Sequence, residues 1–185
     1  MEDNEILELF FARSEQAIAE LAQKYGGTCR KIAENILKDA SDAEECVNDA
    51  YLGVWNTVPP KRPECLPGYL FRIVRNLAVK RYRSNTAQKR NGYYDASLDE
   101  LADCLPSSSS VEAEIEANEL AAVIDGFLAS LDKETRVLFV RRYCFSDPIE
   151  ELAEKFGTSA HNISVRLSRL RKKLKKHLEK EGISL

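Results

Sequence analysis

Residues 147–180 have the sequence DPIEELAEKFGTSAHNISVRLSRLRKKLKKHLEK, which has the pattern of two helices joined by a tight turn. Asp147 is expected to cap the first helix, ahead of a proline at its first position and with Glu150 as the reciprocal cap. Gly157 supplies the positive φ that such a turn needs, and Ser159 is expected to cap the second helix. Apolar residues recur every three or four positions along both helices. The pattern therefore predicts a helix-turn-helix.

The outer face of the second helix is first polar and then basic. In a helix-turn-helix this helix enters the major groove, where Asn can pair with adenine and Arg with guanine. Lysines on the same face neutralise phosphates without reading sequence. The expected DNA contacts are Ser159, His161, Asn162, Ser164, Arg166 and Arg169. The alternative is an ordinary helical hairpin whose basic face is only solvated.

Charge is segregated along the 185 residues, although the net charge is only −3. Residues 1–60 carry twelve acidic against five basic side chains, and residues 61–90 carry nine basic side chains against one acid. Residues 91–118 hold seven acids and no base, whereas residues 166–180 hold eight bases against one acid. Two basic segments separated by an acidic spacer predict two contacts with a polyanion. Solvated helix faces are the alternative for either segment alone.

The N-terminal half is predicted to hold three helices. Apolar periodicity covers residues 12–40, where Gly26 and Gly27 are expected to break or bend the helix. Ser41 and Glu44 form a capping-box pattern ahead of an apolar stripe, in which Val47, Tyr51 and Trp55 are expected in the core. Pro59 and Pro60 end this helix, so that residues 57–67 form a loop before a third helix over 68–83.

These elements together predict an all-α protein of two small helical domains. We expect a first domain over residues 1–90, a flexible acidic linker over 91–115 and a helix-turn-helix domain over 116–185. The segment 136–143 would also fit a short strand, but no partner strand is evident, so a helix is expected.

Composition excludes several classes of protein. The five cysteines form no CxxC pair and only two histidines are present, which argues against a disulfide framework, a zinc cluster or a His-based metal centre. No metal site and no cofactor are expected. No apolar run approaches the length of a membrane span and the N-terminus is acidic, so a cytoplasmic protein without membrane insertion is expected. No Walker loop, nucleophile elbow or dinucleotide motif is present, and no enzymatic activity is expected.

Three segments in this order resemble bacterial RNA polymerase sigma factors of the extracytoplasmic-function type, in the sigma-70 superfamily. The first is DAEECVNDAYLGVW, residues 42–55, and the second is GYLFRIVRNLAVKRYR, residues 68–83. The third runs from Ser130 through IEELAEKFGTS to VRLSRLR, residues 165–171. The resemblance covers about residues 8–90 and 111–180.

The resemblance implies a role for each segment. The acidic helix would dock on core RNA polymerase through side chains off its apolar stripe, namely Glu44, Glu45, Asn48, Asp49 and Asn56. The third helix would contact promoter DNA at the −10 element and help melt it through Arg72, Arg75, Asn76, Lys80 and Arg83, with loop 57–67 reading unpaired bases. For Tyr69 and Phe71, core packing and stacking on a base are equally open. The helix-turn-helix would bind the −35 element, and an anti-sigma factor is expected as a further partner.

Two other classes remain open from the residues. One is a free-standing helix-turn-helix regulator that binds a duplex palindrome without polymerase. The other is a nucleic-acid enzyme such as a recombinase, which would need a clustered catalytic set. The acids at 42–49 instead fall on a solvated helix face.

Overall fold

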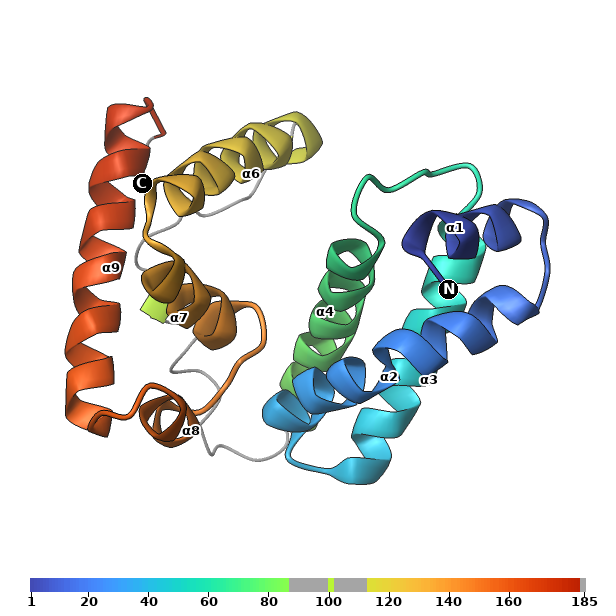
Figure 1. The fold of residues 1–185 in the computed structure, drawn as a ribbon, viewed down its shortest axis with the longest axis horizontal. Helices are drawn as coiled ribbons and strands as arrows, with labels where there is room; N and C mark the ends of the chain where they lie inside the picture. Colours follow the sequence, from blue (N-terminus) through green and yellow to red (C-terminus); the bar gives the residue numbers. More distant parts are fainter. Residues whose placement is uncertain (87–99, 102–112, 184–185) are drawn as a thin grey trace. The chain divides into compact units, whose positions relative to one another are not determined.

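The computed structural model describes residues 1–86, 100–101 and 113–183, and every regular element in these ranges is a helix (Figure 1). The chain divides into two compact units, Met1–Asn91 and Gly92–Leu185, which confirms the all-α class with two helical domains. The first unit contains α1 (Asp3–Phe11), α2 (Gln16–Leu37), α3 (Ala40–Thr57) and α4 (Leu66–Thr86). The second contains α6 (Ala113–Ser130), α7 (Lys133–Tyr143), α8 (Ile149–Lys155) and α9 (Ala160–Lys180). Apart from residues 100–101 and the start of α6, the predicted linker lies outside the described residues.

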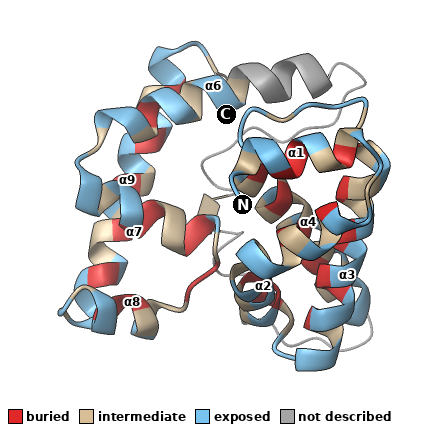
Figure 2. Cartoon of the chain, turned by 45° about the vertical axis from the view of Figure 1, so that its right-hand side comes forward, coloured by how far each residue is buried: buried red, intermediate tan, exposed pale blue. Residues whose placement is uncertain are grey.

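The core of the first unit lies between α2, α3 and α4, with α1 packed against α2. Buried positions recur every three or four residues in each helix, so the helical period of the sequence directs one face inward (Figure 2). The largest fully buried side chains are Ile6, Phe10, Leu21, Ile32, Ile36, Leu66 and Leu70.

Two expectations for this unit are wrong. α2 continues through Gly26 and Gly27 without a break. At Gly26 a Cβ would lie 3.2 Å from the Tyr51 hydroxyl, so the glycine leaves room for α3, whereas a Cβ at Gly27 would meet no atom within 4 Å. α3 is capped by Asp39, whose side chain accepts from the backbone N–H of Asp42 at 2.9 Å, and not by Ser41. A carboxylate in this place also interacts favourably with the helix dipole.

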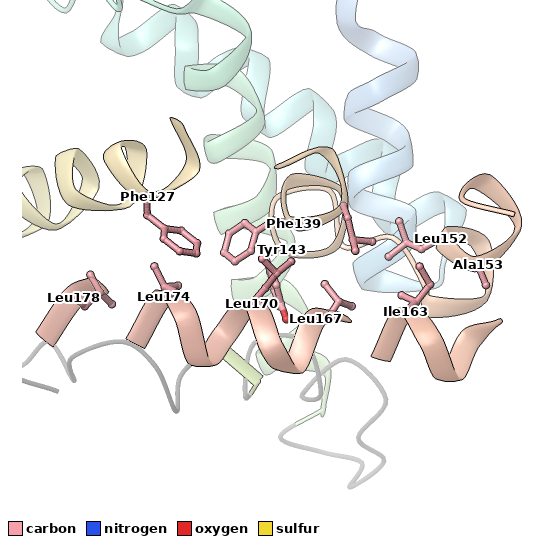
Figure 3. Close-up of a cluster of buried hydrophobic side chains, with 11 residues drawn as sticks. Phe127, Phe139, Tyr143, Leu152, Ala153, Ile163, Leu167, Leu170, Leu174 and Leu178 are labelled. Carbon is pink, nitrogen blue, oxygen red and sulfur yellow. The ribbon is translucent and has the colours of Figure 1, made fainter. Parts of the chain in front are cut away.

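The second unit encloses its own core, formed by α7, α8 and α9 with α6 packed against them. Figure 3 shows Leu167, Leu170, Leu174 and Leu178 in a row along α9, facing the aromatic rings of α6 and α7. Phe127 and Phe139 meet edge to face with ring centroids 6.2 Å apart. The helix expected over 136–143 is confirmed as part of α7.

The helix-turn-helix is present with one correction. Gly157 has φ +59°, and Ser159 accepts from the Asn162 backbone N–H at 3.2 Å, both as expected. Asp147 does not cap α8, whose N-cap is Pro148. The Asp147 carboxylate is fully buried and pairs with Arg141 Nε at 2.6 Å and Lys155 Nζ at 3.3 Å. The Asp147 carboxylate therefore pairs with two cations instead of capping α8.

Candidate polymerase and promoter interfaces

The five side chains predicted to bind polymerase all lie on the outer surface of α3. Glu44, Glu45, Asn48, Asp49 and Asn56 are exposed, and we call them the acidic face of α3. The stripe predicted as core points the other way: Val47 and Tyr51 are buried and Trp55 is half-buried. Leu52, one turn beyond Asn48 and Asp49, is 55% exposed on the same face. Leu52 is not among the predicted contacts, although an apolar residue outside the buried stripe of α3 is a sequence signal that could have identified it.

A charged bridge links the acidic face of α3 to α4. Arg81 pairs with Glu45 Oε2 at 2.5 Å and with Asp42 Oδ1 at 2.9 Å, and Asn85 donates to Asp42 Oδ2 at 2.9 Å. The hydrogen bond and charge of Arg81 lower the pKa of Glu45, and the pKa of Arg81 is raised by the same partners. Arg81 therefore faces α3 rather than nucleic acid, although it lies within the basic segment.

The residues predicted to bind the −10 element follow one side of α4. Arg72, Asn76, Lys80 and Arg83 are exposed and Arg75 is half-buried, so the helix does present a cationic surface outward. They recur at helical spacing opposite the buried side chains of α4. We call this set the basic face of α4.

The two aromatic residues near the start of α4 are both engaged within the protein. The Tyr69 hydroxyl donates to Thr57 Oγ1 at 2.9 Å, and the guanidinium of Arg72 lies 5.5 Å from the Tyr69 ring centroid. Phe71 meets Tyr25 edge to face at 5.8 Å. Both side chains are half-buried, so both rings pack against other residues of the first unit, and neither is fully accessible for stacking on a base.

The predicted −35 contacts lie along the exposed start of α9. Ser159, His161, Asn162, Ser164 and Arg169 are exposed, and Arg166 is partly exposed. Some of these polar groups already have partners: Asn162 Nδ2 donates to Thr158 Oγ1 at 3.1 Å and Ser164 Oγ to the Ala160 carbonyl at 3.0 Å.

Arg166 and Arg169 differ in their surroundings. The Arg166 guanidinium pairs with Glu134 Oε1 at 2.7 Å and lies 5.6 Å from the Phe156 ring centroid. Within the described part of the chain, Arg169 makes no ion pair and is exposed. The lysines that follow on α9 (Lys172, Lys173, Lys175 and Lys176) are also exposed. Because these side chains are exposed, the second unit has a cationic surface, which the prediction of two contacts with a polyanion requires.

Glu100, near the start of the second unit, contacts side chains of α7 and α9 in the same unit. Its carboxylate accepts from Arg142 Nη2 at 3.2 Å, Tyr143 Oη at 3.1 Å and Arg171 Nη1 at 2.7 Å. Burial raises the pKa of Tyr143 to about 12. Leu101 packs against the core of this unit. Arg171 thus pairs with an acid of its own unit, and no local sequence pattern predicts this pair.

The described residues contain no group of three or more His, Cys, Asp and Glu placed to hold a metal ion. The four cysteines among them are free, and burial raises the pKa of Cys29 to about 12 and of Cys46 to about 11. These two thiols are therefore apolar core groups. Within the same ranges, no helix has the length and apolar character that crossing a membrane requires.

Two family models match the chain, one in each unit. Sigma-70 region 2 matches residues 21–88, which include most of α2 and all of α3 and α4, and Sigma-70, region 4, matches residues 122–174. Together they cover more than half of the sequence in the order that the resemblance predicts. The chain belongs to the sigma-70 family of RNA polymerase sigma factors, of the extracytoplasmic-function type.

Individual relatives are more distant. A probable RNA polymerase sigma factor, RfaY of Xanthomonas campestris pv. campestris, is 25% identical over 169 residues, or 90% of this chain. The chain spans 42% of the length of that relative. The solved structure of CnrH in complex with the cytosolic domain of CnrY has 20% identity and a TM-score of 0.45, over 96% of this chain and 97% of the other.

Proposed function

We propose that this chain is a transcription initiation factor that binds bacterial core RNA polymerase and directs it to promoters. The acidic face of α3 binds the polymerase, the basic face of α4 and loop 57–67 bind and open the −10 element, and the start of α9 binds the −35 element. The factor acts in the cytoplasm and contributes binding rather than chemistry. An anti-sigma partner stays a prediction from the resemblance.

The observation that supports this proposal most strongly is the separation of charge in three dimensions. The first unit presents acids on α3 and bases on α4, and the second presents bases on α9. Complementary charge steers partners together and fixes their register more than it adds affinity. One unit with two faces of opposite sign is suited to lie between a basic protein surface and DNA.

The experiment begins with purified core polymerase and the full chain. We expect the chain to bind core polymerase and Glu44→Lys with Asp49→Lys to weaken binding at unchanged helicity, because both side chains are exposed on the same helix face. Glu15→Lys with Glu34→Lys makes the same charge change at two exposed positions next to and on α2, and serves as the matched control.

The second step is run-off transcription from a library with randomised −10 and −35 elements. The proposal predicts enrichment at both elements, and only when polymerase and chain are present together. Binding of the isolated chain to a duplex palindrome, with no polymerase association, would instead support a free-standing regulator.

A further inference from the structure

The loop between α3 and α4 is held in part by side chains from outside it. Its ends are fixed by the buried side chains of Val58 and Leu66, whereas its middle residues are mostly exposed. Prolines occur repeatedly in this loop and have no N–H to donate. Within the loop, the Lys61 N–H donates to the Thr57 carbonyl at 3.0 Å, whereas the Pro59 carbonyl accepts from a side chain outside the loop.

That side chain is Arg13, which donates one hydrogen bond to the loop and one to the last turn of α3. Its Nη1 donates to the Trp55 carbonyl at 2.6 Å and its Nη2 donates to the Pro59 carbonyl at 3.5 Å. In a continuing helix the Trp55 carbonyl would accept from the N–H of residue 59, but residue 59 is proline. Arg13 replaces that missing donor at the end of α3, where a cation also interacts favourably with the helix dipole.

The backbone of Arg13 is itself in an uncommon conformation. It has φ +53°, in the left-handed region that disfavours residues with a Cβ. The guanidinium also lies 5.4 Å from the centroid of the Trp55 ring. A strained backbone held by several side-chain contacts at a predicted functional loop suggests a positioning role.

A second arginine connects the same loop to α1. Arg62, in the middle of the loop, pairs with Glu8, and its guanidinium lies 5.0 Å from the Phe11 ring centroid. Both contacts are to α1, and α1 and Arg13 precede residue 21, where the match to Sigma-70 region 2 begins. The segment before region 2 is thus connected to the loop at two places.

We propose that Arg13 is a positioning residue that fixes the conformation of loop 57–67 and so sets selectivity at the −10 element without contacting DNA. The inference rests on the proposed function, in which this loop reads unpaired promoter bases. A loop fixed in its binding conformation before the strand arrives loses less entropy on binding. Release of the loop should therefore weaken discrimination between bases more than it weakens polymerase binding.

The first test measures the anchor directly, because Trp55 is the single tryptophan of the chain. In Arg13→Gly, glycine accepts the positive φ, so the fold is kept while the contact is lost. We expect easier acrylamide quenching and shifted emission of Trp55. Lys38→Gly is the matched control, since Lys38 is also an exposed cation at positive φ (+57°) that ends a helix. It should leave Trp55 unchanged.

The second test measures selectivity with holoenzyme on the promoter library. Loss of a charge-assisted hydrogen bond shifts a local equilibrium by about tenfold, so the ratio of output between preferred and disfavoured −10 sequences should fall in Arg13→Gly, by at most about tenfold. Preference at the −35 element and core polymerase affinity should match wild type. Arg13→Lys keeps the charge but not the two-point fork, so selectivity should be partly restored.

The outcomes separate the two proposals. Unchanged Trp55 quenching, or unchanged −10 selectivity with altered quenching, would overturn the role of Arg13. If wild-type chain directs no transcription, the proposed function fails, while the Trp55 measurement still shows whether Arg13 anchors the loop.

Discussion

The difference between Arg166 and Arg169 makes the −35 interface quantitatively testable. Each phosphate contact changes the slope of log K against log salt by about 0.9 for duplex DNA. Losing one contact therefore lowers affinity about fivefold at ~0.15 M salt and about fifteenfold at ~0.05 M. Arg169 is exposed without an ion pair among the described residues, so Arg169→Gln should show this full effect if Arg169 contacts a phosphate.

Arg166 must first leave Glu134 if it is to bind a phosphate. The side chains of this pair are 34% and 62% exposed, and an exposed pair stabilises by about 0.2–1 kcal/mol. Glu134→Gln should therefore strengthen duplex binding between about 1.4-fold and about fivefold. Glu150→Gln, which removes an exposed acid from the first turn of α8, is the charge-matched control.

The assay is fluorescence anisotropy of holoenzyme on a labelled duplex carrying the selected −35 element, over a series of salt concentrations. A double-mutant cycle of Glu134→Gln with Arg166→Gln isolates their coupling, because Arg166→Gln should cost more when Glu134 is absent. If Glu134→Gln and Glu150→Gln behave alike, the ion pair does not restrain Arg166. An unchanged salt slope for Arg169→Gln would remove that residue from the interface.

Three further predictions concern individual residues. Leu52→Asn should weaken core polymerase binding by about four- to sixteenfold without loss of helicity, because Leu52 is 55% exposed and burying that part of its surface contributes about 0.8–1.6 kcal/mol. Equal binding would place Leu52 outside the contact. Gly157→Ala should lower the free energy of unfolding of the second unit by about 1–2 kcal/mol in urea titrations, since φ is +59° and the new Cβ meets no atom within 4 Å; a neutral result would contradict the left-handed turn. Arg81 lowers the pKa of Glu45, so the ion pair stabilises the folded protein above the ordinary carboxyl pKa, and this stabilisation is lost as the pH falls through the lowered pKa. The difference in melting temperature between wild type and Glu45→Gln should therefore vanish in acid. In the Arg81→Gln background, Glu45→Gln should change the melting temperature at no pH.

Local signals in the sequence predicted much of the fold. The apolar stripe of α3 and the turn at Gly157 depend on helical periodicity and on one backbone angle, which neighbouring residues specify. The break expected at Gly26 is wrong: a glycine pair usually marks the end of a helix, whereas here the missing Cβ of Gly26 permits the close approach of Tyr51 on α3 to α2. The cap expected from Asp147 is wrong because its buried carboxylate pairs with Arg141 and Lys155, which lie outside the local capping pattern.

The contacts that were not predicted join residues far apart in the sequence. Arg13 reaches Trp55 across 42 positions and Arg166 reaches Glu134 across 32, and neither pair shares a periodic pattern. Glu100 meets Arg171 across 71 positions. Such pairings follow from how helices pack, so the composition of a basic segment does not tell which of its cations face outward.

Hydroxyl-radical footprinting of holoenzyme on a selected promoter, with permanganate detection of unpaired thymines, tests the central claim most directly. The proposal predicts two separated protected segments, one for each unit, together with unpaired thymines next to the downstream segment. These signals should require polymerase and should weaken with Glu44→Lys and Asp49→Lys. A single continuous protected palindrome, formed by the chain alone and without unpaired bases, would contradict it.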